Sequence, residues 1–110
     1  MTRDHLGEFE QLVLLAVLQE GDRAFGLEVR DRIERDAGRT VSRGAFYTTL
    51  ERLERKGFLR WDEAVPEDSR RSGTLRRYAV TPDGLAAVRT SPAAADALAR
   101  GLDGILGTAG

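Results

Sequence analysis

The spacing of apolar residues predicts two helices in the first third of the chain. Over residues 7–20 the apolar side chains fall almost all round the helix, which predicts a central helix covered on more than one side. Over residues 25–37, Phe25, Val29 and Ile33 recur four residues apart as a buried stripe, while the opposite face is an ordinary mixture of solvated charges. We therefore expect both helices to contribute to one hydrophobic core.

A third helix is predicted to begin after Ser42 and to end at Gly57, and its two faces differ. Ser42 is a good N-cap, and Val41 and Phe46 are spaced for a hydrophobic staple. The predicted buried face consists of Ala45, Phe46, Thr49, Leu50 and Leu53. The opposite face at the start of the helix carries small or hydrogen-bonding residues, namely Arg43, Gly44, Tyr47 and Thr48.

This early face has the chemistry of a nucleic-acid contact. It offers donors and no local acid, and the free N–H groups of a helix N-terminus favour anions. Two helices joined by a tight glycine-containing turn, the second presenting polar groups at its start, also form the helix-turn-helix pattern. The alternative is a surface helix that happens to carry a tyrosine.

Beyond Gly57 the pattern changes from helical to extended. Residues 58–61 and 75–80 each predict a short strand rich in aromatic and branched residues, and residues 66–74 form a polar loop between them. Thr81 and Pro82 then open a further helix. The predicted fold is mainly α with a small β-hairpin: a winged helix-turn-helix, with the loop as its wing, followed by a C-terminal helix.

The C-terminal segment has two interpretations. Ser91-Pro92 interrupts its helix, and the apolar stripe that follows contains glycines, each of which weakens a helix by ~1 kcal/mol relative to alanine. The segment is either a disordered tail or a helix stabilised by packing across a dimer interface. We expect a DNA-binding domain at residues 1–81 and a helical dimerisation segment at 82–110. The candidate dimerisation residues are Phe9, Leu12, Leu85, Val88, Leu98, Leu102 and Ile105.

The residue content excludes several classes of site. The 110 residues are enough for one domain with a modest core. Disulfides and thiolate metal sites are excluded because there is no cysteine, and the one histidine, His5, lies near the N-terminus. The chain also lacks a glycine-rich phosphate loop and a carboxylate pair in an apolar setting. We therefore expect no enzyme activity, no metal and no cofactor.

The sequence carries no signal for a membrane or for export. No apolar run approaches the ~20 residues that span a bilayer. The N-terminus lacks the apolar core of a signal peptide. We expect a cytoplasmic protein without a membrane partner.

Positive charge is concentrated in the middle of the chain, although the net charge is −1. Residues 1–38 carry five basic and nine acidic side chains, residues 39–77 carry ten and six, and residues 78–110 carry two and three. The basic segment coincides with the third helix and the hairpin, as expected of a DNA-binding module.

Four segments share their pattern with one protein family. They are residues 6–18 (LGEFEQLVLLAVL), residues 24–29 (AFGLEV), residues 41–57 and residues 76–84 (RRYAVTPDG). Together they resemble the PadR family of winged-helix transcriptional regulators. The resemblance implies a dimeric repressor whose third helix enters the major groove and whose wing touches the DNA backbone. It also implies a C-terminal helix that supports dimerisation and helps to form an effector pocket, although the C-terminal part of this chain is short and rich in glycine.

The predicted contacts of the third helix follow from side-chain chemistry. Arg43 is the candidate base contact, since arginine can bind guanine O6 and N7 with both arms of its fork. Tyr47 is the candidate phosphate ligand, flanked by Ser42, Gly44 and Thr48. The alternative for Tyr47 is partial burial against the second helix.

The hairpin supplies the remaining predicted contacts. Arg70 and Arg71 of the loop are favoured as backbone contacts over a plain solvated loop. Arg76 and Arg77 point to opposite faces of their strand, so at most one of them should reach DNA, and we assign Arg77. Trp61 either lines an effector pocket or, as strand tryptophans more often do, fills the core or an interface.

A monomer of this size would touch too few phosphates for tight specific binding. We therefore expect a homodimer that places its third helices ~34 Å apart on an inverted repeat of double-stranded DNA. A small-molecule effector is a further expected partner, of a chemistry that the sequence does not identify. The alternative function is a winged-helix protein–protein interaction module without specific DNA binding.

Overall fold

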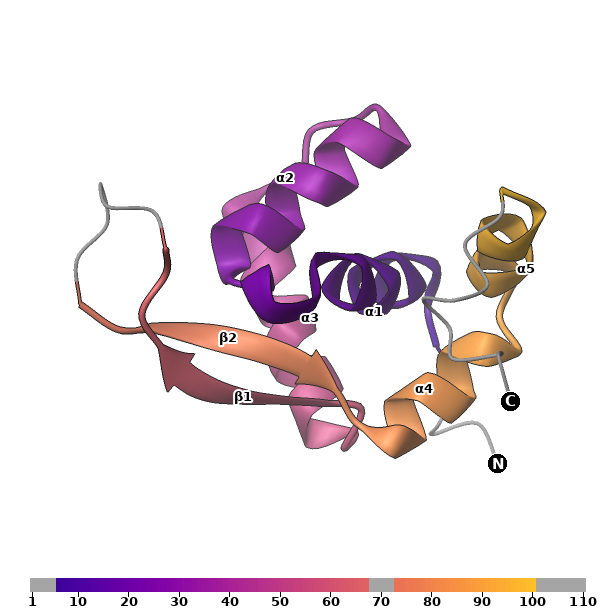
Figure 1. Cartoon of the computed structure of the whole chain (residues 1–110). Coiled ribbons are helices and arrows are strands. Elements are labelled where there is room, and N and C mark those ends of the chain that lie inside the picture. Colours follow the sequence, from indigo (N-terminus) through magenta and orange to yellow (C-terminus); the bar gives the residue numbers. More distant parts are fainter. Residues whose placement is uncertain (1–5, 68–72, 101–110) are drawn as a thin grey trace.

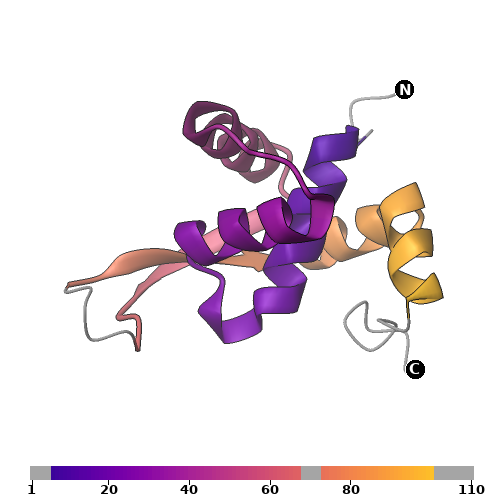
Figure 2. The same ribbon diagram turned by 90° about the horizontal axis from the view of Figure 1, so that it is seen from above.

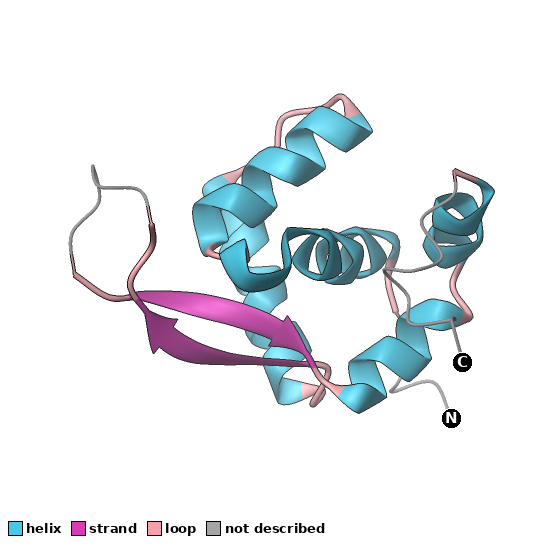
Figure 3. Cartoon of the chain, in the orientation of Figure 1, coloured by secondary structure: helices cyan, strands magenta, loops and turns pink. Residues whose placement is uncertain are grey.

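The computed structural model describes residues 6–67 and 73–100, which form helices packed around one face of a two-stranded hairpin (Figures 1 and 3). In chain order the elements are α1 (Glu8–Glu20), the 3-10 turn η1 (Gly21–Arg23), α2 (Gly26–Ala37), α3 (Arg43–Arg55), β1 (Leu59–Ala64), β2 (Leu75–Val80), α4 (Pro82–Arg89) and α5 (Pro92–Ala99). This order confirms the predicted fold class, mainly α with a small β-hairpin.

Helix α1 is the central element, as its nearly continuous apolar surface predicts. It contacts α2, α3, α4, α5 and β2, and Figure 2 shows it between the α2–α3 side of the molecule and the α4–α5 side. Val13 and Leu14 of α1 are fully buried. Its buried Gln11 also donates a hydrogen bond from Nε2 to the Leu6 carbonyl and accepts one from the N–H of Ala93 at 3.1 Å, which ties α1 to α5.

The link between α2 and α3 is fixed by local capping. Gly38 ends α2 in the left-handed region that favours glycine, with φ of 66°, and its N–H donates to the carbonyl of Glu34. The carboxylate of Glu34 accepts a hydrogen bond from the N–H of Val41 at 2.7 Å. Ser42 Oγ then accepts from the N–H of Ala45 at 3.2 Å, which confirms the predicted N-cap of α3.

The buried face of α3 differs from its prediction at one position. Phe46, Thr49, Leu50 and Leu53 are buried, but Ala45 is exposed. Each residue turns a helix by about 100°, so Ala45 lies roughly a quarter-turn from the centre of the buried stripe. At the first turn of α3 this angle is enough to leave Ala45 in solvent.

The hairpin is longer on its first strand than predicted. Strand β1 begins one residue later than the predicted 58–61 segment and continues to Ala64. In the antiparallel register Asp62 lies opposite Arg77 and Glu63 lies opposite Arg76. Opposite charges at paired positions stabilise a sheet, which explains why the strand continues through two acidic residues.

The C-terminal helices pack on α1 within the same chain. Thr81 and Ser91 each cap the following helix, accepting from the N–H of Gly84 and Ala94, and Ser91 lies at the predicted interruption. The buried side chains of these two helices include Val88, which is fully buried.

The predicted dimerisation residues divide into three groups in the structure. Val88 has no exposed surface, so this assignment is corrected: Val88 belongs to the chain's own core. Phe9, Leu12 and Leu85 are half-buried, and Leu98 is exposed. Leu102 and Ile105 lie outside the described residues. Across the described ranges, no helix is long and apolar enough to cross a membrane.

Candidate nucleic-acid interface

The start of α3 presents the predicted contact residues to solvent. Ser42, Arg43, Gly44 and Thr48 are exposed, and Tyr47 is 38% exposed. The first turn of α3 contains no acidic residue. Because the first N–H groups of a helix carry a partial positive charge, this end of α3 favours negatively charged ligands.

Tyr47 lies between α2 and the outer face of α3. Its ring meets Phe46 edge-on, with centroids 5.1 Å apart, and the guanidinium carbon of Arg43 lies 5.5 Å from its centroid. Its hydroxyl lies against Gly26 at the start of α2, where a Cβ atom would come within 2.5 Å of it. The alternative of partial burial against α2 is therefore observed, while the phosphate contact of Tyr47 stays a prediction.

A groove beside Tyr47 joins the helices to the hairpin. It has a volume of about 280 Å³ and lies between the start of α2, α3 and β2. Its lining residues are Gly26, Leu27, Tyr47, Leu75, Arg76 and Tyr78. Leu27 is 49% exposed, which is unusual for a large apolar side chain. The groove brings Arg76 of the hairpin to the same hollow as Tyr47 of α3.

The two arginines of β2 have different partners. Arg77 donates from Nη2 to Asp62 Oδ2 at 3.0 Å and from Nε to Asp62 Oδ1 at 3.3 Å. This hydrogen-bonded contact raises the pKa of Arg77 and, with the charge of Arg77, holds the pKa of Asp62 below its ordinary value. The guanidinium carbon of Arg76 instead lies 4.1 Å from the centroid of Trp61.

The uncompensated positive charge of this region lies along α3 and β2. Within residues 6–67 and 73–100, the arginines of this surface that form no ion pair are Arg43, Arg52, Arg55 and Arg76. The Glu54 carboxylate forms no ion pair with them and accepts a hydrogen bond from Trp61 Nε1 at 3.0 Å. The α3 surface therefore has charges free to meet phosphates.

The predicted contacts do not include Gly26 or Leu27, and they assign Arg77 in preference to Arg76. The alternation of strand β2 carried a signal, since Arg76 and the buried Tyr78 are two residues apart and so share a face. Nothing in the local sequence indicates that Gly26 meets Tyr47, which depends on how α2 and α3 cross. Of the predicted loop residues, Arg70 and Arg71 lie outside the described residues.

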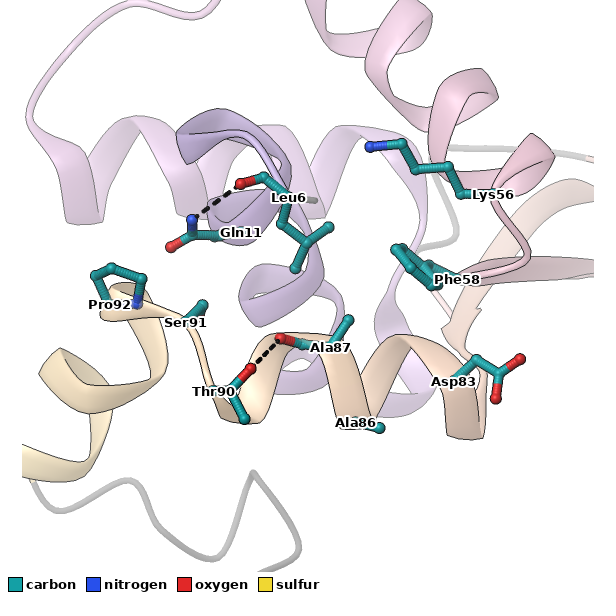
Figure 4. Close-up of a pocket in the computed structure, with 10 residues that line it drawn as sticks. All are labelled: Leu6, Gln11, Lys56, Phe58, Asp83, Ala86, Ala87, Thr90, Ser91 and Pro92. Atoms are coloured by element: carbon teal, nitrogen blue, oxygen red, sulfur yellow. Dashed lines mark hydrogen bonds between the residues drawn. The ribbon is translucent and has the colours of Figure 1, made fainter. Parts of the chain in front are cut away.

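A larger hollow lies at the other end of α3, between the start of α1 and α4 (Figure 4). Its volume is about 650 Å³, and its polar side chains include Gln11, Lys56 and Thr90. Gln11 bonds to the Leu6 carbonyl, and Thr90 bonds to that of Ala87. Lys56 bonds to both carboxylate oxygens of the buried Glu10, at 2.9 and 3.0 Å. The side chains of Gln11, Lys56 and Thr90 are therefore engaged with the protein itself.

Comparison with known proteins identifies a protein family and a similar fold. The sequence model of the transcriptional regulator PadR-like family matches residues 14–90, more than half of the chain. No curated protein matches. Among solved structures, the chain is similar to the crystal structure of a proposed transcriptional regulator from Thermoplasma acidophilum, with a TM-score of 0.58 and 21% identity over 93% of this chain and 97% of that chain. At this identity the likeness shows the fold alone.

Proposed function

The chain belongs to the PadR-like family of transcriptional regulators, and from that premise we propose that it binds double-stranded DNA in a sequence-specific manner as a repressor. Helix α3 enters the major groove, and the hairpin contacts the sugar-phosphate backbone. The observation that carries the proposal is the exposed, acid-free start of α3, where Arg43 and Tyr47 stand side by side.

Each residue of the α3 front has a separate proposed role. Arg43 contacts base edges, because its planar fork matches the two acceptors of guanine. Tyr47 donates its hydroxyl to a phosphate and so fixes the position of α3 on the duplex. Ser42 and Thr48 flank it as further backbone ligands, and Gly44 leaves room for close approach of the DNA.

The hairpin contributes the backbone contacts in this proposal. Arg70 and Arg71 of the loop are the proposed contacts to the DNA backbone. Arg77 is the least favourable of the predicted ligands, because binding a phosphate would require it to give up Asp62.

We also propose that the functional unit is a homodimer, with residues 82–110 as its dimerisation segment and residues 1–81 as its DNA-binding domain. A groove of about 590 Å³ between α1 and α5 supports this, because Leu12 and Leu15 line it. Leu98, which also belongs to α5, is 41% exposed and adds to the apolar surface of this helix. Phe9 and Leu85 are further proposed contacts, and such apolar surface is typical of a face that a partner covers.

Fluorescence anisotropy with labelled promoter DNA tests the DNA-binding function across a range of salt concentrations. If a dimer neutralises six to ten phosphates, its affinity should fall by ~10³ to 10⁵ between 50 and 200 mM salt. Arg43→Ala should relax sequence preference by ~1–3 kcal/mol, whereas Tyr47→Phe should weaken binding to all sequences alike. A flat salt response would favour the alternative, a protein–protein interaction module.

A further inference from the structure

The two neighbouring arginines of β2 have different surroundings, and these point to different roles. Building on the proposed DNA binding, we propose that Arg76 is a phosphate ligand of the hairpin, that Trp61 positions it, and that Arg77 serves the hairpin's own structure. The ligand is a backbone phosphate of the duplex whose major groove receives α3.

Arg76 is held in place and still accessible. Its guanidinium carbon lies 4.1 Å from the centroid of Trp61, and Arg76 lines the same groove as the buried Tyr78. Arg76 is exposed, and although Glu63 lies opposite it in the hairpin register, no carboxylate of the described residues comes within ion-pair distance of it. An arginine stacked on an aromatic face keeps its full charge and free donors in the ring plane, which suits a phosphate oxygen.

The position of Arg76 places this charge beside the proposed recognition helix. Arg76 and Tyr47 line the same groove, together with Gly26. A phosphate bound by the Tyr47 hydroxyl would therefore have the Arg76 guanidinium on the same side of the molecule. One strand of DNA backbone crossing the groove could engage both residues.

Arg77 is already neutralised. Two of its nitrogens bond to the two carboxylate oxygens of Asp62, directly across the hairpin. Its backbone also pairs with Phe25 in an isolated bridge, which ties β2 to the start of α2. A phosphate would have to replace Asp62, so removing Arg77 should affect the hairpin more than the binding of DNA.

Trp61 links Arg76 to α3, the proposed recognition helix. Its Nε1 donates to Glu54 of α3 at 3.0 Å, while its ring carries Arg76. A chain of contacts thus runs from α3 through Trp61 to β2. Trp61 is a positioning residue in this proposal, since it acts on DNA only through Arg76.

Two variants with the same change of charge provide the test. Arg76→Gln and Arg77→Gln are compared by anisotropy titration of the full chain on the same DNA, with thermal unfolding as a check of folding. Arg76→Gln should lower the affinity about tenfold to a hundredfold for each subunit of the proposed dimer, the range for a lost hydrogen bond to a charged group. Because both subunits lose one phosphate contact, it should also reduce the salt slope by about 2, whereas Arg77→Gln should leave that slope unchanged.

The fluorescence emission of Trp61 provides a second readout. If Arg76 only supported the fold and did not contact DNA, the change in this emission on adding DNA would not depend on Arg76. Trp61 is the one tryptophan of the sequence, so its fluorescence reports this site alone. DNA should change the emission of the wild type and change it far less in Arg76→Gln. Trp61→Phe, which keeps an aromatic face under Arg76, should retain the salt slope, and Trp61→Ala should lose about two units of it, one for each subunit.

The outcomes separate this inference from the function on which it rests. If the wild type binds no DNA, the proposed function fails and this inference fails with it. If the wild type binds DNA but Arg76→Gln and Arg77→Gln behave alike, or Arg77→Gln alone reduces the salt slope, Arg76 is not the ligand while DNA binding stands.

Discussion

The hydroxyl of Tyr47 lies directly against the backbone of Gly26, so that a Cβ atom at that position would stand 2.5 Å from the phenolic oxygen. Tyr47 projects from α3 and Gly26 begins α2, so this contact joins the two helices of the helix-turn-helix. The missing side chain at residue 26 therefore sets where the Tyr47 hydroxyl points.

Gly26→Ala should displace Tyr47 without unfolding the protein. The clash involves the end of a partly exposed side chain, which can move away, and not rigid backbone. If the displaced hydroxyl loses its phosphate, DNA affinity should fall about twofold to tenfold, the range for one hydrogen bond. Anisotropy titration measures the loss, and thermal unfolding checks the fold.

A double-mutant cycle with Tyr47→Phe shows whether Gly26 acts through the hydroxyl. In the phenylalanine background, Gly26→Ala should cost much less affinity, because the atom nearest to the new methyl group is gone. Equal losses in both backgrounds would mean that Gly26 matters for another reason, such as the approach of DNA to α2.

Gly44→Ala should separate stability from DNA binding. No atom lies within 4 Å of a Cβ built at Gly44, and the residue is helical and exposed. Alanine should therefore stabilise the fold by up to about 1 kcal/mol through helix propensity. The same methyl group should weaken DNA binding, because it occupies the surface assigned to the major groove. Urea denaturation and anisotropy together test this, and unchanged affinity would remove Gly44 from the interface.

Gly84→Ala should have the opposite effect on stability. A Cβ at Gly84 would lie 2.3 Å from the carbonyl oxygen of Phe58, which is backbone and cannot move independently. The overpacking should destabilise the protein by about 1–3 kcal/mol, occasionally more. Urea denaturation measures the change, with Gly44→Ala as the matched control for a glycine in open space. Equal stability of the two variants would show that α4 shifts freely relative to the backbone of Phe58.

The ends of the helices could be predicted because capping is local. Ser42 and Thr81, the two predicted caps, each accept a hydrogen bond from the N–H three residues further on. Ser91, for which the sequence predicts only an interruption of the helix, does the same for α5. The central position of α1 could also be predicted, since an almost wholly apolar helix must be covered on several sides. Both features depend on residues close together in the chain.

Features that depend on how elements dock could not be predicted. The ion pair between Arg77 and Asp62 could not be foreseen, because it depends on the register of the hairpin, which places Asp62 opposite Arg77. The burial of Val88 depends on α4 packing on α1, and the exposure of Ala45 depends on how far α3 projects beyond the core. The contact between Gly26 and Tyr47 depends on the crossing of two helices.

Alkaline pH should destabilise the fold through Tyr78. This side chain is 5% exposed, and burial raises its pKa above the ordinary value of 10.0, although its hydrogen bond to Arg76 opposes the rise. The unfolded chain releases the phenolic proton first, so stability should fall as pH rises above about 10. Thermal unfolding between pH 9 and 11 should show a smaller loss for Tyr78→Phe than for the wild type. An identical loss in both proteins would assign the effect to other groups.

The central claim is that two copies of α3 contact DNA through Arg43 and Tyr47. Selection of bound fragments from random DNA tests it most directly. We predict an enriched inverted repeat whose half-site centres lie about one helical turn, roughly 10 base pairs, apart, and loss of one guanine preference in each half-site when Arg43→Ala is selected in parallel. Recovery of no common sequence, or of the same repeat with the same preference in Arg43→Ala, would contradict the claim.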